Sequence, residues 1–179
     1  MDYAVLLYFE EKADCLIDKW TQDLVKLGLN SRFAEIGMKP HLTLAEFDLT
    51  DLGEVENLLK DFASWQQPVD LKFSSLGVFP GENSVLFLNP VVSERLVKLH
   101  QDLNSLLGKC CNDFSPLYTE EHWVPHCTLA LDYDNDHLNQ AMRYLGSRFL
   151  PIDTKAVSIV LYGCCPYHEM MVLPLNNQD

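Results

Sequence analysis

The sequence predicts an α+β fold of two pseudo-symmetric lobes, each an antiparallel-rich sheet with outer helices, and a central cleft between them. One short pattern occurs twice, as Pro-His-Leu-Thr-Leu at residues 40–44 and as Pro-His-Cys-Thr-Leu at residues 125–129. The histidines are 85 residues apart in a chain of 179 residues, and each half alternates strand-like with helix-like segments. No linker rich in proline, glycine or serine separates the halves. We therefore expect one bilobal domain over residues 1–179, with lobes near 1–82 and 83–179 and strands that can exchange between them.

The first half is predicted to contain strand, helix, strand, helix and strand in that order. Continuous apolar residues or strict alternation indicate strands, whereas apolar residues three or four apart indicate helices. Gly28 and Asn30 are stop signals for the first helix, and Thr50 or Asp51 would cap the second. The expected elements are a strand over Tyr3–Phe9, a helix over Glu11–Leu29, a strand over about Lys39–Phe47, a helix through Phe62 and a strand over Val69–Val78.

The second half is predicted to repeat this plan. Turn residues over Pro80–Asn83 lead into a hairpin partner strand, and Ser93 is a good cap for a helix with a leucine stripe. Asp134 or Asp136 would cap the last helix. The expected elements are a strand over Val85–Leu88, a helix through Leu107, a loop over Gly108–Trp123, a strand over Val124–Leu131, a helix through Leu145 and strands over Ala156–Leu161 and Glu169–Leu175.

Each copy of the repeated pattern places a histidine and a threonine on one face of a strand. Successive side chains of a strand point to opposite faces, so His41 and Thr43 would point one way, with Leu42 and Leu44 in the core. Residues 126–129 repeat this arrangement. Near neutral pH, one imidazole can act as a general acid and the other as a general base, and two hydroxyls can bind an anion. One such pair from each lobe therefore indicates phosphoester chemistry.

The paired His-x-Thr elements, their spacing and the chain length resemble the 2H phosphoesterase superfamily. The most similar branch is that of the bacterial and archaeal 2′-5′ RNA ligases or RNA 2′,3′-cyclic phosphodiesterases. Leu76–Pro80 and Val85–Leu88 resemble the central hairpin of this family, and Ala156–Tyr162 resembles its penultimate strand. The resemblance covers the chain from Tyr3 to about Leu175.

By this resemblance, His41 and His126 are the catalytic acid and base, and Thr43 and Thr128 bind the substrate phosphate. The implied reaction is hydrolysis of a 2′,3′-cyclic phosphate, or of a similar small phosphodiester, on nucleotides or short RNA. Water is deprotonated on one side of phosphorus and the leaving oxygen is protonated on the other, with no metal and no cofactor required. Which histidine is the base stays open, because the roles depend on the substrate and on the direction of the reaction.

Aromatic side chains near the cleft could stack on a base or ribose. Each candidate could equally pack in the core or in a hairpin. The candidates are Phe79, Tyr133, Tyr162 and Tyr167.

The chain is acidic, with 13 basic residues, 26 acidic residues and a formal net charge of −13. Proteins that bind long nucleic acid normally carry a basic stripe, and this sequence has none. We therefore expect a small nucleotide, or a short RNA end with a cyclic phosphate, as the partner, and neither long nucleic acid nor a membrane. Without a secretory signal or an apolar run of about 20 residues, the sequence predicts a cytoplasmic protein, which we expect to be a monomer.

The six cysteines are expected to be reduced thiols, because no secretory signal precedes them. A zinc site at Cys164, Cys165 and His168 would have a spacing that matches no standard ligand set. His100 and His137 fall in predicted helices and are expected at surface positions.

Two other functions remain open at this point. A non-catalytic nucleotide-binding module would keep the cleft without turnover, and the acidic surface gives this alternative some weight. Two complete His-x-Thr copies favour catalysis, because a module that only binds would not need two proton-transfer groups. A 2′-5′ RNA ligase would run the same chemistry in reverse, since hydrolysis and ligation share one transition state.

Overall fold

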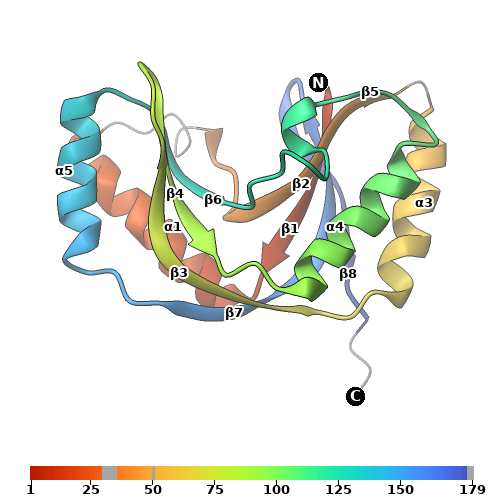
Figure 1. Cartoon of the computed structure of the whole chain (residues 1–179), viewed down its shortest axis with the longest axis horizontal. Helices are drawn as coiled ribbons and strands as arrows, with labels where there is room; N and C mark the ends of the chain where they lie inside the picture. Colours follow the sequence, from red (N-terminus) through yellow and green to blue (C-terminus); the bar gives the residue numbers. More distant parts are fainter. Residues whose placement is uncertain (30–35, 50, 177–179) are drawn as a thin grey trace.

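Within the part of the chain that the structure describes, eight strands form one antiparallel sheet (Figure 1). The structure is a computed structural model that describes residues 1–29, 36–49 and 51–176. The strands are β1 (Tyr3–Phe9), β2 (His41–Leu49), β3 (Val69–Phe79), β4 (Ser84–Pro90), β5 (Cys111–Phe114), β6 (Cys127–Tyr133), β7 (Ile152–Cys164) and β8 (Tyr167–Pro174). The helices are α1 (Glu11–Lys26), α3 (Leu52–Trp65), α4 (Glu94–Leu107), α5 (Asn135–Gly146) and the short 3-10 helix η1 (Pro116–Tyr118).

Strand β7 joins the two halves of the chain. The strand order is β5-β2-β1-β7-β3-β4-β6, and β8 pairs with β7 outside this path. Residues 152–156 of β7 pair with β3, whereas residues 156–163 pair with β1. The strand that carries the first histidine motif, β2, therefore lies on one side of β7 in the sheet order, and the strand of the second motif, β6, lies on the other.

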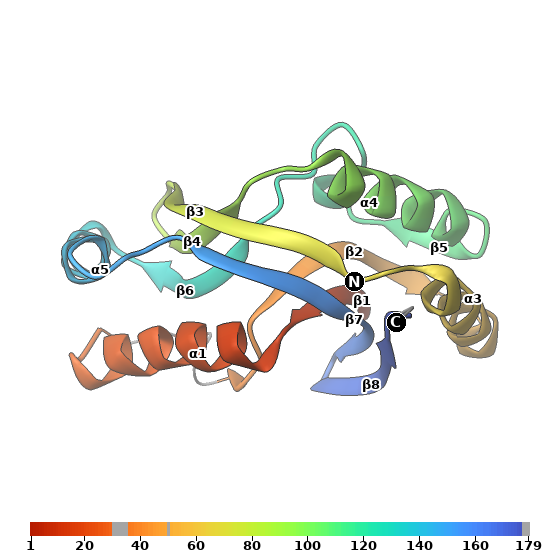
Figure 2. The same ribbon diagram turned by 90° about the horizontal axis from the view of Figure 1, so that it is seen from below.

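The helices cover the two ends of this sheet. Helices α1 and α5 contact β6, and α5 also contacts β4. At the other end, α3 contacts β7 and β8, and α4 contacts β2 (Figure 2). This arrangement confirms the predicted α+β fold, while the division into lobes at residue 82 stays a prediction. Strands β2 and β6 contact each other, so the fold brings the two histidine motifs together.

Three helix caps are formed by side chains that the sequence predicts. The carboxylate of Asp51 accepts a hydrogen bond from the backbone N–H of Glu54, and the hydroxyl of Ser93 accepts one from Leu96. Asp134 caps α5 in the same way. Helix α1 ends at Lys26, earlier than predicted, and Gly28 then takes a left-handed φ of 74°. Thr50 and Asn30 lie outside the described residues.

The predicted loop over Gly108–Trp123 is wrong, because it contains β5 and η1. Strand β5 has only four residues, and its outer two are half-buried while its middle two are exposed. Buried and exposed residues therefore do not alternate along β5 as they do in a strand with one face in the core. Its strand form depends on pairing with the edge of β2, where Phe114 lies opposite Phe47. The second motif strand also begins later than predicted, at Cys127 rather than Val124.

The described residues form two apolar clusters on the sheet. The larger one lies between the sheet and the helices, and it includes the apolar residues of both histidine motifs. A smaller cluster covers the opposite face of β1 and β7 and is formed by Ala4, Leu6, Tyr8, Val160 and Tyr162. In the described part of the chain, no helix is long and apolar enough to cross a membrane.

Candidate active site

His41 is the first residue of β2 and is almost fully buried, with 7% of its surface exposed. Its Nδ1 lies 2.7 Å from the backbone carbonyl oxygen of Lys39. A carbonyl oxygen can only accept a hydrogen bond, so Nδ1 carries a proton and donates it. In the neutral imidazole the lone pair is then on Nε2, which is able to accept a proton.

His126 is held in the same way, immediately before β6 begins. Its Nδ1 lies 2.7 Å from the carbonyl oxygen of Val124. Each histidine thus binds the carbonyl two residues earlier, across the proline of its own motif. The two imidazoles therefore have the same orienting bond and the same tautomer, although His126 is more exposed than His41.

The two imidazoles also interact electrostatically. Burial lowers the pKa of His41 from 6.5 to about 4, and a charge on His126 adds to this, against the opposite effect of the bond to Lys39. Burial lowers the pKa of His126 as well. Both rings are therefore biased toward the neutral form until an anion enters, because a nearby negative charge raises an imidazole pKa.

Thr43 and Thr128 follow the histidines on β2 and β6, and both are half-buried. The intervening residues of each motif belong to the core. Those with 0% exposure are Leu42, Leu44, Cys127 and Leu129, which confirms the predicted core face of both strands.

A β-bulge in β2 changes which side chains share the face of Thr43. The pairing of β1 with β2 shifts register between Val5 and Leu6, so β2 has one extra residue between Thr43 and Ala45. After the bulge, Ala45 is fully buried whereas Glu46 is only half-buried. Glu46 thereby joins the face of Thr43, which strict alternation in the sequence would not predict.

An aromatic cluster lies beside the second motif. The ring of Phe79 packs edge-on against His126, with centroids 4.9 Å apart and planes at 89°. Phe87 on β4, which the sequence reasoning missed, lies 5.2 Å from the same imidazole and opposite Thr128 in the strand pairing. Gly77 makes room for this ring, because a Cβ there would lie 2.3 Å from Cε2 of Phe87. Phe79 is thus placed where a base or ribose next to His126 could contact it.

The three candidate tyrosines are placed differently. Tyr133 is 1% exposed inside the larger core, so its ring is closed to a ligand. Tyr162 is buried in the smaller cluster, and the exposed ring of Tyr167 lies 6.5 Å from it. Tyr162 shares this cluster with Tyr8, the β1 residue opposite His41 in the strand pairing.

A polar network beside His41 was not predicted from the sequence. The hydroxyl of Tyr8 donates to Oε1 of Glu169 at 2.9 Å, and Nζ of Lys39 lies 3.4 Å from the same oxygen. The Lys39 ammonium also lies 5.2 Å from the centroid of the Tyr8 ring. Burial, with Glu169 adding to it, raises the pKa of Tyr8, so the hydroxyl stays protonated. The network holds Lys39, whose carbonyl orients the His41 imidazole.

The predicted surface position of His100 is wrong, because this α4 residue is 1% exposed. Its ring stacks on Trp123, with centroids 3.8 Å apart and planes at 2°. Trp123 in turn donates from Nε1 to the carbonyl oxygen of Thr43 at 2.9 Å. The segment that leads into the second motif is therefore anchored on the strand of the first. Burial lowers the pKa of His100 to about 4.

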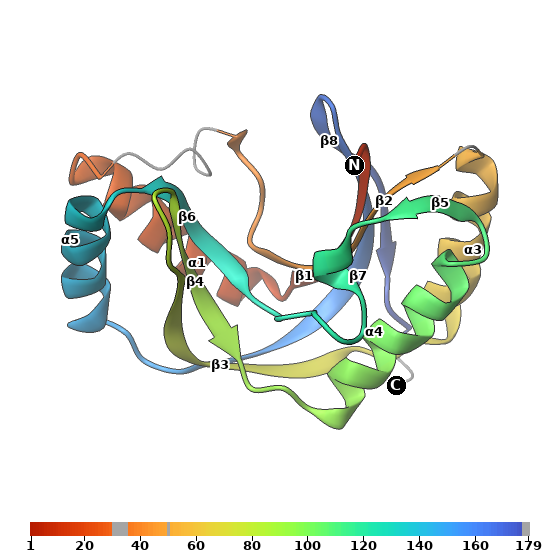
Figure 3. The same cartoon turned by 45° about the horizontal axis from the view of Figure 1, so that its top comes forward.

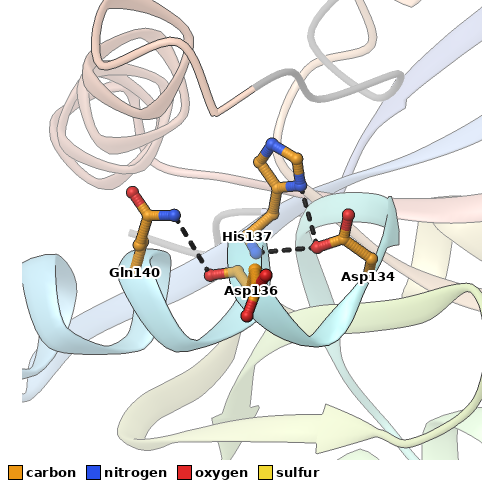
Figure 4. A network of polar contacts seen from close by, with 4 residues as sticks. All are labelled: Asp134, Asp136, His137 and Gln140. Atoms are coloured by element: carbon orange, nitrogen blue, oxygen red, sulfur yellow. Dashed lines mark hydrogen bonds and ion pairs between the residues drawn. The ribbon is translucent and has the colours of Figure 1, made fainter.

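His137 lies in the first turn of α5, with 45% of its side chain exposed. Its backbone nitrogen and its Nδ1 each lie 2.8 Å from Oδ1 of Asp134 (Figure 4). One turn after Asp136, Gln140 donates from Nε2 to the Asp136 carbonyl oxygen at 3.4 Å. This histidine therefore belongs to a helix cap on the surface, as the sequence predicts.

Among the described residues, no group of three or more histidine, cysteine, aspartate and glutamate side chains is arranged to hold a metal ion. His168 instead places Nδ1 2.6 Å from the carbonyl oxygen of Pro166. The described cysteines form no disulfide.

The sequence model of the 2′-5′ RNA ligase superfamily matches residues 18–163, a span that includes both histidine motifs. The chain belongs to this superfamily. A protein of Bacillus pumilus (strain SAFR-032) that is named as a phosphoesterase is 30% identical over 153 residues, which cover 83% of this chain and 80% of the relative. This membership confirms the resemblance seen in the sequence, and it supports a phosphoesterase-type activity.

Solved structures share the fold. TT0787 of Thermus thermophilus has a TM-score of 0.65 at 14% identity, with 100% of both chains covered. E. coli LigT complexed with 3′-AMP has a TM-score of 0.60 at 16% identity, with 98% of both chains covered. LigT complexed with NADP+ has a TM-score of 0.58 at 17% identity and the same coverage. At these identities the likeness shows the fold.

Proposed function

We propose that this member of the superfamily is a phosphodiesterase that hydrolyses a 2′,3′-cyclic phosphate, or a similar small phosphodiester, on nucleotides or short RNA. The observation that carries the proposal is the matched pair His41 and His126. Each binds a backbone carbonyl through Nδ1 at 2.7 Å, which fixes the same tautomer in both rings, with the lone pair of the neutral imidazole on Nε2. The LigT complexes with 3′-AMP and NADP+ support a small nucleotide as the ligand class.

In the proposed reaction His41 is the base. Its low pKa, caused chiefly by burial, keeps it neutral at cellular pH. It takes a proton from water, the water oxygen bonds to phosphorus, and the bond from phosphorus to one ribose oxygen breaks. Protonated His126 donates its proton to that leaving oxygen, and each proton transfer contributes about 10²–10⁴-fold.

The acid must be charged when substrate is bound. The anionic phosphodiester raises the pKa of a neighbouring imidazole, and His126, the more exposed of the two, can take up a proton from solvent. Thr43 and Thr128 donate hydrogen bonds to the non-bridging oxygens, where charge develops. All four groups come from one chain, so the proposed enzyme works as a monomer and as a single bilobal domain. The two histidines and two hydroxyls supply the proton transfers and the charge stabilisation without a metal ion or cofactor.

The test is hydrolysis of the four nucleoside 2′,3′-cyclic monophosphates, with and without EDTA, by the wild type and by His41→Ala and His126→Ala. We expect turnover that survives EDTA and falls by at least about 10²-fold in each variant. His137→Ala, a surface histidine, is the matched control and should retain full activity. The phosphate position in the product identifies the bond that breaks.

Other outcomes would replace the proposal. Loss of turnover in EDTA, with recovery on adding a divalent metal, would contradict the two-histidine mechanism. Stabilisation by nucleotides without product would indicate a binding module, and joining of 2′,5′ ends as the main reaction would indicate a ligase.

A further inference from the structure

The chain between β5 and β6 crosses from the strand of the first histidine motif to that of the second. It begins on β2, where the backbone N–H of Ser115 donates to the carbonyl oxygen of Glu46 at 2.9 Å. The helix η1 contacts β2, and the chain continues from there to β6 (Figure 3). Its end, residues 124–126, is neither helix nor strand, because β6 begins at Cys127. His126 therefore lies outside the pairing of β6 with β4 that fixes the rest of its motif.

Trp123 ties this end of the segment to the first motif. Its indole Nε1 donates to the carbonyl oxygen of Thr43 at 2.9 Å, and its backbone N–H donates to that of Thr119 at 2.9 Å. The next residue, Val124, places its carbonyl oxygen 2.7 Å from Nδ1 of His126. A single peptide bond thus separates the residue that is anchored on β2 from the residue whose carbonyl orients the second imidazole.

The indole ring of Trp123 is itself held in one orientation. It stacks on the buried imidazole of His100 from α4, with centroids 3.8 Å apart and planes at 2°. That imidazole is fixed in turn, because its Nε2 lies 3.0 Å from the carbonyl oxygen of Tyr118 and 2.8 Å from Nδ2 of Asn104. Trp123 is therefore held from α4 through its ring face and from β2 through its N–H.

We propose that Trp123 is a positioning residue that holds the His126 imidazole in a fixed place relative to Thr43. The inference rests on the proposed function, in which His126 is the acid and Thr43 binds the phosphate. His126 must deliver its proton to the leaving oxygen while the Thr43 hydroxyl holds a non-bridging oxygen of the same phosphate. Both groups must therefore keep one relative position, and the bond from Trp123 to the Thr43 carbonyl links their backbones directly.

Loss of this link should impair proton transfer more than substrate binding. Misplacement of a reacting group by about 1 Å can cost about 10²-fold in rate. Trp123→Phe keeps an aromatic ring against His100 but removes the N–H, so Val124 and its carbonyl lose their anchor on β2. We expect kcat for a 2′,3′-cyclic mononucleotide to fall about 10- to 100-fold, with a change in KM below about twofold.

A second substrate separates a positioning role from a merely structural one. A ribose oxygen needs a proton from the acid to leave, whereas p-nitrophenolate is a weak enough base to leave without one. We therefore expect Trp123→Phe to lower kcat for thymidine 3′-(p-nitrophenyl phosphate) by less than about threefold. Equal losses of kcat on the two substrates would overturn the inference, because they would show general damage to the site.

Trp20→Phe is the matched control. Trp20 is 8% exposed and lies in α1, where its ring packs against Phe149 and not against either histidine motif. The same substitution there removes the same volume, so it shows what a loss of stability alone does to turnover. We expect its kcat to stay within about twofold of the wild type. A loss of kcat equal to that of Trp123→Phe would overturn the inference.

The position of His126 can also be followed without turnover. Its ring lies 4.9 Å from that of Phe79 and 5.2 Å from that of Phe87, so the NMR chemical shifts of its ring protons report its place beside them. We expect these shifts to change in Trp123→Phe and to stay the same in Trp20→Phe. Unchanged His126 shifts in Trp123→Phe would overturn the inference whether or not the protein hydrolyses a cyclic phosphate. The proposed function fails separately, if wild-type turnover is absent or does not depend on both histidines.

Discussion

Lowering the pH from 8 to 5 is expected to destabilise the folded protein through His41. In the unfolded chain this histidine has a pKa near 6.5, whereas burial lowers its pKa to about 4 in the folded protein. Between these values the unfolded state binds more protons than the folded state. The free energy of unfolding therefore falls as the pH falls through this window, and the contribution of His41 is constant above about pH 7.5.

The size of the effect follows from the two pKa values. Their full separation corresponds to about 3 kcal/mol, which is reached only below pH 4. At pH 5 the folded imidazole is mostly neutral and the unfolded one mostly charged, which gives a loss of about 2 kcal/mol relative to pH 8. His41 is only 7% exposed, so solvent screening does not reduce this value much. A loss of this size is a large fraction of the roughly 5–15 kcal/mol that stabilises a typical domain.

The assay is urea unfolding of the wild type and of His41→Asn at pH 5, 6, 7 and 8. Asparagine keeps an N–H donor for the carbonyl of Lys39 but does not titrate. The other titrating groups, including buried His100 and Asp14, are present in both proteins and largely cancel in the difference. We expect the stability of the variant relative to the wild type to grow by about 2 kcal/mol from pH 8 to pH 5. A difference that stays constant across this range would refute the reasoning.

Three further substitutions test other parts of the structure. Asp14→Asn should raise the free energy of unfolding, measured with urea, by about 1–2 kcal/mol at pH 8. The reason is that burial raises the pKa of Asp14 to about 6 and its Oδ1 has no hydrogen-bond partner. This gain should shrink toward pH 4, where the wild-type carboxyl group becomes protonated. Gly77→Ala should cost about 1–3 kcal/mol in thermal melts and lower kcat by displacing the Phe87 ring, and an unchanged Tm would contradict the close approach. Trp123→Phe should cost about 1 kcal/mol in urea unfolding by removing the bond to the Thr43 carbonyl, and undiminished stability would show that this anchor is dispensable.

The parts of the fold that depend on local sequence were predictable. Ser93, Asp51 and Asp134 cap helices because a short polar side chain before a helix can accept a bond from its first turn. Within the two motifs, the core positions Leu42, Leu44, Cys127 and Leu129 follow from alternation. The joining role of β7 was not predictable, because pairing with both β1 and β3 depends on contacts between distant segments.

In the candidate site, too, some features depend on local sequence and others on contacts between distant segments. The hydrogen bond from each imidazole to a carbonyl two residues earlier is local, and it is the same in both motifs. The bulge that brings Glu46 onto the face of Thr43 has no signal in the alternation, since it arises from register against β1.

What differs between the two motifs comes from distant residues. Tyr8 reaches Glu169 across 161 positions to form the polar network beside His41, and Trp123 reaches Thr43 across 80. His126 instead lies against the ring of Phe79, supplied by the hairpin of β3 and β4. A duplicated sequence pattern thus gives two equivalent imidazoles, and tertiary contacts make them unequal: both have a lowered pKa, but His41 is deeply buried whereas His126 is more open to solvent. This inequality supports our proposal that His41 is the base and His126 the acid, whereas the sequence pattern alone treats the two as interchangeable.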